Sequence, residues 1–400
     1  MLSHYFYIIM YKFIDEEKEV EEVINYCKEL SVLSIDTETQ GFDPHTKNLL
    51  LLQIGNREKQ FVIDCSKISP LHFKEVIESK LCIAHNMKFD WRFLYHNGID
   101  IKNIYDTFLA ECILTTGYER GDGELGLADL TEKYLGFKLD KSIRGEIHKQ
   151  GLSTEVIEYA AKDIAYLEDI MNIQLEKITE FNLHTILNLE NEVCRVFAKM
   201  EYDGISFNSN KLKEVIVELS EINKSLEKSL DEIIVEESHT NKKLIKYTQI
   251  QQDLFTQDIR KTIINWKSPK QKTDILNKLN IAVNSVDDKT LQKLKNTHKI
   301  VPLYIELSKY SKLESSFGTA LLKFINPVTK RIHSNVWQIL STGRISMSEP
   351  NCQQIPAHSN LGQTIKSCFV ASDGYKIVSA DFSGKIKIGM IIVEYILGKP

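Results

Sequence analysis

The sequence predicts a mixed α/β domain, followed by a mainly helical region and then by the start of an α+β region. From about residue 31 to 175, short apolar runs alternate with stretches of helical period, which is the pattern of α/β domains. Beyond about residue 180 the apolar residues repeat almost only at the helical period, and strand character returns near residue 331. We therefore expect domains at 1–180, 181–330 and 331–400.

Periodicity and end signals place the individual elements. In the first domain, short apolar runs predict strands at 32–35, 49–54, 61–64 and 81–84, with a further strand at 5–10. Amphipathic stretches predict helices at 71–78, 87–97, 106–114, 127–135 and 154–173, the last with Ser153 as its N-cap. Later in the chain we expect helices at 185–200, 211–236, 273–279, 290–295 and 301–324, a polar segment at 239–272, and strands at 331–340 and 376–380.

The composition is that of a folded globular chain. Hydrophobic residues make up 42% and charged residues 26% of the 400 positions, which excludes collagen-like, low-complexity and largely disordered chains. The seven cysteines form no CxxC pair, so we expect free thiols in a reducing compartment. Because no apolar run approaches the roughly 18 residues that a membrane span needs, we expect no membrane partner.

Charge is distributed unevenly along the chain. Residues 1–200 hold 22 basic and 34 acidic side chains, whereas residues 201–400 hold 28 and 21. A positive excess in the C-terminal half favours binding of a polyanion such as nucleic acid. Solvated helix faces explain many such imbalances, so the charge alone leaves both interpretations open.

Four carboxylates and a tyrosine form the first group of candidate site residues. Asp36 and Glu38 lie two apart at the end of a predicted strand, so both side chains point to one face of the sheet. Asp90 lies in the helix at 87–97, while Tyr159 and Asp163 lie four apart on one helix face. Phosphodiester hydrolysis by two Mg²⁺ ions, roughly 3.5–4 Å apart, needs such oxygen ligands.

The order and spacing of these residues resemble the DEDD superfamily of 3′-to-5′ exonucleases, in the subgroup with Tyr in the last motif, over about residues 20–180. The resemblance implies an RNase H-like domain with a mixed sheet. It also implies that Asp36 bridges two Mg²⁺ ions, with Mn²⁺ as a possible substitute. Tyr159 would orient the attacking water, and the other metal ligands would be Glu38, Asp90 and Asp163.

The same resemblance implies roles for two further residues. Phe42 occupies the place of an apolar wedge against the 3′-terminal base of DNA, and the alternative is a loop anchor in the core. Asn86 would hold its own loop or bind the DNA backbone. For the whole set, the alternative is a catalytically inactive relic of this fold.

A second group of candidate residues lies at 341–356, a segment rich in polar amides and turn formers around Arg344. Arg and amide side chains can reach the minor-groove acceptors that every base pair presents, so the segment can hold a duplex end without reading its sequence. The predicted strand at 376–380 then leads to Asp381.

These segments resemble the family A DNA polymerases, of the bacterial and phage DNA polymerase I type, whose motifs are T-G-R-L-S, P-N-L-Q-N-I-P and D-Y-S-Q-I-E. With earlier phrases at 201–205 and 265–271, the resemblance spans nearly everything after residue 20. It implies a thumb at 181–330 and the start of a palm at 331–400. Asp381 would be a catalytic metal ligand of the palm, and the DNA-binding residues would be Arg344, Asn351 and Gln354.

The pattern departs from the family near residue 400. The given sequence ends shortly after Asp381, before a finger helix or an H-D-E segment, and Ile386 stands where the family has Glu. We expect a truncated or frame-shifted reading of a longer gene. Because two-metal phosphoryl transfer needs more than one palm carboxylate, we expect the exonuclease alone to turn over.

The leading functional hypothesis is a portion of a family A DNA polymerase that proofreads at primer 3′ ends. Its partners would be primer-template duplex and a single-stranded 3′ end, with dNTPs for the full-length polymerase. We expect a monomer in the bacterial cytoplasm at the nucleoid, or in the host cytoplasm if a phage encodes it. The alternatives are a stand-alone exonuclease similar to RNase D and a non-catalytic DNA-binding remnant.

Overall fold

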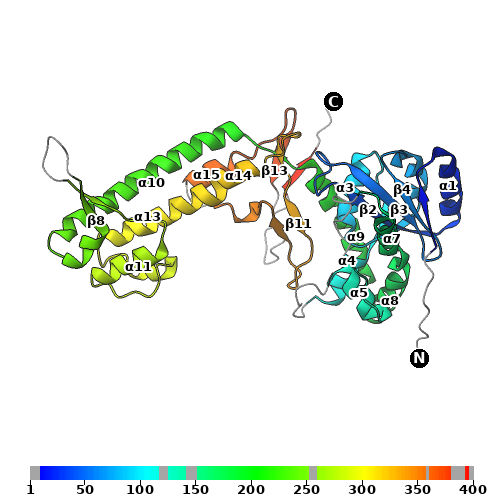
Figure 1. Cartoon of the computed structure of the whole chain (residues 1–400), viewed down its shortest axis with the longest axis horizontal. Coiled ribbons are helices and arrows are strands. Elements are labelled where there is room, and N and C mark those ends of the chain that lie inside the picture. Colours follow the sequence, from blue (N-terminus) through cyan, green and yellow to red (C-terminus); the bar gives the residue numbers. More distant parts are fainter. Residues whose placement is uncertain are drawn as a thin grey trace. The chain divides into compact units, whose positions relative to one another are not determined.

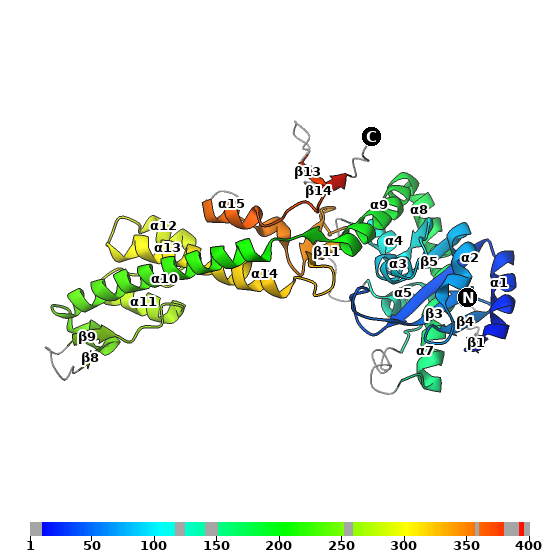
Figure 2. The ribbon, with the colours of Figure 1, turned by 90° about the horizontal axis from the view of Figure 1, so that it is seen from above.

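The computed structural model describes residues 10–116, 125–140, 151–251, 259–356, 360–379 and 392–395. The chain divides into two compact units, whose elements are shown from two directions in Figures 1 and 2. The first unit contains Met1–Ile205, Asn326–Gln353 and Asp373–Pro400, and the second contains Ser206–Ile325 and Gln354–Ser372. The boundaries that the sequence suggests near residues 180 and 330 stay predictions.

A six-stranded mixed sheet forms the centre of the first unit, in the order β1-β4-β3-β2-β5-β6. Strand β3 runs antiparallel to both of its neighbours, and all other neighbouring pairs are parallel. The predicted mixed sheet is therefore confirmed. Its strands are β1 (Tyr11–Ile14), β2 (Val32–Thr39), β3 (Leu49–Gly55), β4 (Gln60–Asp64), β5 (Leu81–Ala84) and β6 (Asn103–Asp106).

Helices cover both faces of this sheet. On one face, Leu33 and Ile35 of β2 pack in the main core with Trp91 and Leu94 of α3. On the other face, α7 packs its small residues against β3 and β4. The helices of the unit are α1 (Val20–Glu29), α2 (Lys74–Ser79), α3 (Met87–His96), α4 (Thr107–Leu114), α5 (Leu127–Leu135), α7 (Thr154–Ala165), α8 (Leu167–Glu180) and α9 (His184–Asp203), with short turns η1 (Glu17–Glu19) and η2 (Pro70–Phe73).

Some elements of the first unit differ from the prediction. Strands β1 and β6 were not expected, because each has only four residues and carries little periodicity. The predicted helix at 154–173 is two helices, which meet at Tyr166, where φ is −111° instead of the helical value near −63°. Of the predicted strand at 5–10, residues 5–9 lie outside the described residues.

The segment 326–353 belongs to the first unit because it contributes to the core of that unit. Ile339 is 6% exposed and packs in the main core, and Gln338 donates through Nε2 to the backbone oxygen of Glu190 in α9 at 2.7 Å. Its elements, with those of the last segment, are β10 (Arg331–Ile332), β11 (Asn335–Trp337), β12 (Ser346–Ser348), β13 (Lys376–Ser379) and β14 (Ile392–Tyr395).

The second unit is largely helical, as predicted. Its core lies between α10 and α13, with Leu230, Ile234 and Tyr304 among its fully buried residues. The polar segment predicted at 239–272 contains a hairpin of β8 and β9 that the sequence did not indicate. The elements are β7 (Ile205–Ser206) at the passage from the first unit, α10 (Ser209–Ser238), η3 (Lys242–Tyr247), β8 (Thr248–Gln251), β9 (Ile259–Thr262), α11 (Pro269–Lys278), α12 (Asp288–Lys293), α13 (Ile300–Lys312), the π-helical η4 (Leu313–Thr319), α14 (Ala320–Lys323) and α15 (Asn360–Lys366). The short turn η5 (Cys352–Gln354) lies where the chain passes from the first unit back to the second.

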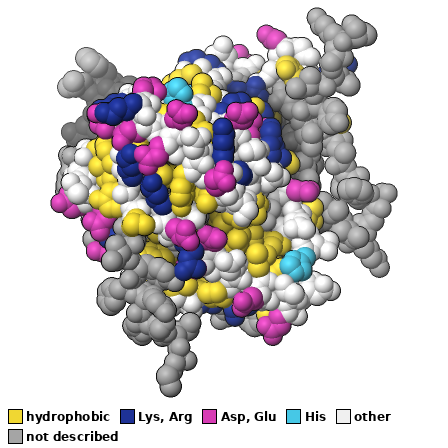
Figure 3. Space-filling model, turned by 90° about the vertical axis from the view of Figure 1, so that its right-hand side faces the viewer, with side chains coloured by type: hydrophobic (Ala, Val, Ile, Leu, Met, Phe, Trp, Pro, Cys, Tyr) yellow, Lys and Arg dark blue, Asp and Glu magenta, His cyan; other side chains and the backbone are white. Residues whose placement is uncertain are grey.

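The state of the cysteines, the character of the helices and the charges on one face can be compared with the expectations from composition. All seven cysteines are free. Among the described helices, none has both the length and the apolar character that crossing a membrane requires. On the face shown in Figure 3, Lys and Arg side chains are interspersed with Asp and Glu, so no patch of a single charge sign is visible there.

Candidate active site

Strand β2 presents the first two carboxylates. Along β2 the buried positions include Thr37 and Thr39, whereas Asp36 and Glu38 alternate with them and are partly exposed. In the antiparallel pairing with β3, Asp36 lies opposite Gln53 and Glu38 lies opposite Leu51. The alternation therefore aims both carboxylates at the face of the sheet that α7 covers, as the spacing of two predicts.

Helix α7 brings the third carboxylate to the same place. Ser153 caps the helix, because its Oγ accepts from Val156 N at 3.3 Å, as predicted. Ala160 and Ala161 are fully buried against the sheet, so the helix lies close to the strands. Asp163, on the next turn, then offers a carboxylate oxygen within 4.8 Å of those of Asp36 and Glu38.

This cluster has the character of a metal site. Three carboxylates that converge within 4.8 Å repel one another unless a cation neutralises them, and oxygen-only ligands suit a hard dication such as Mg²⁺ or Mn²⁺. Tyr159 lies one helical turn before Asp163 on α7 and is 8% exposed. The structure thus brings together three of the four predicted acidic ligands beside the predicted tyrosine.

Asp90 lies next to this group rather than within it. Helix α3 starts three residues after β5 ends, at a point where β2 no longer pairs with β5. Asp90 is 2% exposed, and its Oδ1 accepts from Thr37 Oγ1 at 2.6 Å. Burial raises the pKa of Asp90 well above its ordinary value. A cation nearby would oppose that shift, because it favours the charged carboxylate.

Phe42 and Asn86 are both at the surface. The Phe42 side chain is 83% exposed and meets Phe89 of α3 edge to face, with ring centroids 6.3 Å apart. That exposure disagrees with a loop anchor in the core. Asn86 has a positive φ of 69°, which Asn tolerates better than most residues, and it turns the chain from β5 into α3.

The second group of predicted residues lies at the surface as well. Arg344 is exposed in the loop between β11 and β12, where its backbone oxygen accepts from Leu340 N at 2.8 Å. Asn351 is partly buried, and its Oδ1 accepts from Gln353 N at 3.1 Å. Gln354 is exposed and begins a segment of the second unit. Asp381 lies outside the described residues.

Comparison with known protein families covers both units. Residues 11–179 match the 3′-5′ exonuclease family found in family A polymerases, and residues 209–388 match DNA polymerase family A itself. The chain belongs to the family A DNA polymerases and carries their 3′-to-5′ exonuclease domain. The predicted resemblance is therefore confirmed, and the carboxylate cluster falls within the exonuclease domain.

Homology to bacterial DNA polymerase I extends over most of the chain. DNA polymerase I of Borreliella burgdorferi is 28% identical over 94% of this chain, and that of Aquifex aeolicus is 26% identical over 96%. The DNA polymerase of Escherichia phage T5 is 26% identical over 93% of this chain. The chain spans 41%, 63% and 46% of these three relatives, respectively.

A solved structure shares the fold. The POL domain of Pol1 from M. smegmatis, in complex with DNA primer-template and dNTP, superposes with a TM-score of 0.70 at 19% identity. The match covers 91% of this chain and 59% of that one.

The acidic cluster of Asp36, Glu38 and Asp163 lies in the region that matches the exonuclease family and is consistent with the metal site of a family A exonuclease domain.

Asp106 is a residue of the exonuclease domain that the sequence analysis missed. It is 1% exposed, and its carboxylate accepts from the backbone N–H groups of Asn86 and Met87 at 2.9 Å and from Phe108 N at 2.9 Å. It therefore caps both α3 and α4 and fixes the helix that carries Asp90. Burial raises its pKa to about 6. An Asp at the first position of the predicted helix at 106–114 was the available signal, because Asp is a preferred N-cap residue.

Glu201 is a second missed residue. It is 4% exposed in α9, and its carboxylate lies 2.5 Å from Lys88 Nζ and 3.3 Å from Arg92 Nη1, both in α3. Its Oε1 also accepts from Val336 N of β11 at 2.7 Å. Glu201 therefore joins α3, α9 and the segment that leads to Arg344. No local sequence signal shows such a contact, because the partners lie more than a hundred positions apart.

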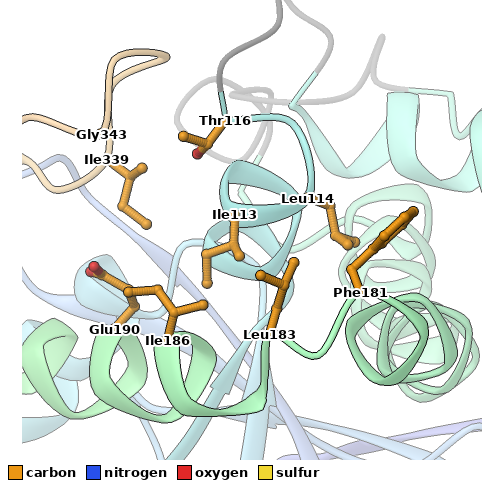
Figure 4. A pocket seen from close by; sticks show the side chains of 9 residues that line it. All are labelled: Ile113, Leu114, Thr116, Phe181, Leu183, Ile186, Glu190, Ile339 and Gly343. Atoms are coloured by element: carbon orange, nitrogen blue, oxygen red, sulfur yellow. The ribbon is translucent and has the colours of Figure 1, made fainter.

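A cavity of about 470 Å³ lies elsewhere in the exonuclease unit (Figure 4). Glu190 is the charged residue among its lining side chains, and its Oε2 accepts from Gln338 Nε2 at 2.6 Å. The cavity therefore offers no cluster of groups for hydrolysis. Its lining residues are Ile113, Leu114, Thr116, Phe181, Leu183, Ile186, Glu190, Ile339 and Gly343.

Proposed function

We propose that this chain removes nucleotides from the 3′ ends of DNA by metal-dependent hydrolysis, as the proofreading activity of a family A polymerase. The convergence of Asp36, Glu38 and Asp163 within 4.8 Å in a domain that matches the 3′-5′ exonuclease family carries the proposal. Two Mg²⁺ ions bound there would prepare a water for attack on phosphorus and stabilise the leaving 3′ oxygen. Water forms the new bond to phosphorus while the bond between phosphorus and the 3′ oxygen of the preceding nucleotide breaks. That oxygen takes up a proton to become the new 3′ hydroxyl of the strand, and a nucleoside 5′-monophosphate is released.

The side chains divide this work. Asp36, Glu38 and Asp163 would hold the ions, and Asp90, which accepts a hydrogen bond from Thr37, would be a further ligand. The Tyr159 hydroxyl, one turn from Asp163, orients the attacking water.

Two surface residues guide the DNA end to these groups. Phe42 stacks on the terminal base, because its ring is exposed and supported on one edge by Phe89. Asn86 binds the DNA backbone at the start of α3.

The remaining predicted site residues belong to the polymerase region. We propose that Arg344, Asn351 and Gln354 bind primer-template duplex, and that Asp381 is a palm metal ligand when dNTPs are incorporated. A protein of these 400 residues holds one aspartate that matches the palm, so we expect it to degrade primers without extending them. We propose that it acts as a monomer on DNA in the cytoplasm, at the nucleoid or in a phage-infected host.

The proposed activity is tested with a 3′-mismatched DNA primer, the full chain and Mg²⁺. We expect stepwise shortening of the primer, abolished by EDTA. Asp36→Ala should slow it about a thousandfold or more, because ion binding fails. Glu158→Ala, which removes an exposed carboxylate of α7, the helix that carries Asp163, should leave the rate unchanged. An intact primer under conditions in which a DNA polymerase I control degrades it would refute the proposal.

The same assay separates the alternatives. The match of residues 209–388 to family A argues against a stand-alone exonuclease similar to RNase D. Faster shortening of RNA than of the same DNA sequence would nevertheless favour it. Salt-dependent binding of primer-template without any hydrolysis would favour a non-catalytic remnant.

A further inference from the structure

Gln53, in the middle of β3, is a buried amide without a partner. Its side chain is 0% exposed, and neither Nε2 nor Oε1 has a hydrogen-bond partner among the described residues. Burying an unpaired amide costs roughly 1–3 kcal/mol in proteins. Such a group in a native structure requires an explanation, and one common explanation is a functional site that it serves.

The register of the sheet places Gln53 beside the carboxylate cluster. Gln53 pairs directly with Asp36 across the antiparallel β2–β3 ladder. Residues directly opposite each other share one face of a sheet, with Cβ atoms about 4.5–5.5 Å apart. On its other side, Gln53 pairs with Val62 of β4. The amide therefore lies on the face that carries Asp36.

The nearest side chains to Gln53 along β3 and across to β4 are apolar. Leu51, two residues before Gln53, and Val62, its neighbour across β4, pack against Val156 and Ala160 of α7. None of these side chains can donate to or accept from an amide. The register also brings Ser34 of β2 and Gln60 and Asp64 of β4 to this face, but the Gln53 amide has no hydrogen bond to any of them, and its direct neighbour across β2 is Asp36.

The chemistry of a metal site explains what an amide does there. Carboxylates that ligate a cation are held by further hydrogen bonds, and loss of such a bond typically weakens metal binding 10- to 100-fold. An amide suits this role, because it provides donors to a carboxylate and an acceptor for a water of the hydration shell. It adds no charge to a site that already holds several carboxylates.

We propose that Gln53 is a positioning residue of the divalent-cation site. With the cation bound, the amide N–H donates to the Asp36 carboxylate and Oε1 accepts from a water in the hydration shell of the ion. Gln53 touches neither DNA nor the reacting phosphorus. The inference rests on the proposed function, because it assumes that Asp36 ligates the cation.

The test substitutes Gln53→Met, which removes the amide at nearly constant volume. Mn²⁺ binding to the full chain is followed by the electron paramagnetic resonance signal of free Mn²⁺. We expect the Kd for Mn²⁺ to rise about 10- to 100-fold. In primer hydrolysis, the Mg²⁺ concentration for half-maximal rate should rise, while KM for DNA stays constant and saturating Mg²⁺ restores most of kcat.

A matched control comes from the same face of the sheet. Gln60 of β4 is also 0% exposed, and its Oε1 has no partner among the described residues, but its Nε2 donates to Asn56 O at 2.7 Å. It pairs with Gly55 rather than with Asp36. Gln60→Met should lower the free energy of unfolding without changing the Kd for Mn²⁺. In contrast, Gln53→Met should leave the metal-free protein as stable as wild type or more stable, because it removes an unpaired amide.

The outcomes separate the inference from the proposed function. An unchanged Kd for Mn²⁺ in Gln53→Met, with Asp36→Ala clearly weakened, overturns the inference alone. Equal Mn²⁺ binding by wild type and Asp36→Ala, together with an intact primer, overturns the proposed function. If Gln53→Met does not fold, a crystal structure of the wild-type chain with Mn²⁺ decides. An amide turned away from both Asp36 and the hydration shell would then refute the inference.

Discussion

Two buried carboxylates at helix α3, Asp90 within the helix and Glu201 facing it from α9, differ in what compensates their charge. Glu201 meets Lys88 and Arg92 and accepts from a backbone N–H, so its charge is balanced by the fold. Asp90 is as deeply buried, yet among the described residues its carboxylate accepts from the neutral Thr37 hydroxyl, and burial raises its pKa. Glu201 therefore stabilises the domain. The Asp90 carboxylate has no cationic partner among the described residues, and a bound metal ion would supply the compensating positive charge.

The largest change in the free energy of unfolding is expected at Glu201, whose charge is balanced by side chains of α3. Glu201→Gln leaves two cations in α3 without an anion, and we expect the free energy of unfolding to fall by about 3–5 kcal/mol. The measurement is urea unfolding of the metal-free protein at pH 7. Asp203→Asn breaks an exposed pair with Lys199 and should cost only about 0–1 kcal/mol. Equal costs for the two variants would contradict the comparison.

At Asp90 we expect a substitution to raise the free energy of unfolding instead of lowering it. Because its pKa is raised in the folded state, the metal-free protein loses stability as the pH rises above the ordinary aspartate pKa of about 4. Asp90→Asn removes this loss and should raise the free energy of unfolding by about 1–3 kcal/mol at pH 7.5 in EDTA.

The pH profile makes this prediction specific. The stability difference between Asp90→Asn and wild type should be small at pH 4 and should grow toward pH 8. Added Mg²⁺ should stabilise wild type more than the variant, since ligand binding to the folded state alone raises stability. A difference that is constant across the pH range would contradict the assignment of an uncompensated charge to Asp90.

The smallest effect is expected at the surface. Phe42→Ala should change the free energy of unfolding by less than about 0.5 kcal/mol, because the ring is 83% exposed. Loss of base stacking, worth about 1 kcal/mol or more, should raise KM for a 3′-mismatched primer about fivefold or more. Phe181→Ala, at another exposed ring of the same unit, is the control. An unchanged KM would remove Phe42 from the DNA path.

The local spacing of residues in the sequence predicts part of the fold and of the candidate site. The spacing of two in Asp36 and Glu38, and of four in Tyr159 and Asp163, placed each pair on one face, as the structure has them. The family resemblance then linked the pairs, because their contact across about 125 positions leaves no local signal. The strand at 81–84 and the helix at 127–135 were predicted with the bounds that the structure has.

The rest depends on tertiary contacts. The partners of Glu201 lie on α3 and β11, far away in the sequence. The proposed role of Gln53 depends on the register between β2 and β3. The break at Tyr166 was not expected, because the apolar residues keep the helical period through it. The four-residue strands β1 and β6 form because the sheet pairs them, not because of their own periodicity.

The central claim is that acidic side chains from β2 and α7 hold divalent cations. The most direct test is anomalous diffraction from crystals of the full chain soaked in Mn²⁺. We expect a manganese peak in contact with the carboxylates of Asp36, Glu38 and Asp163, and its loss in Asp36→Ala. Saturating Mn²⁺ with no peak between these three side chains would contradict the account.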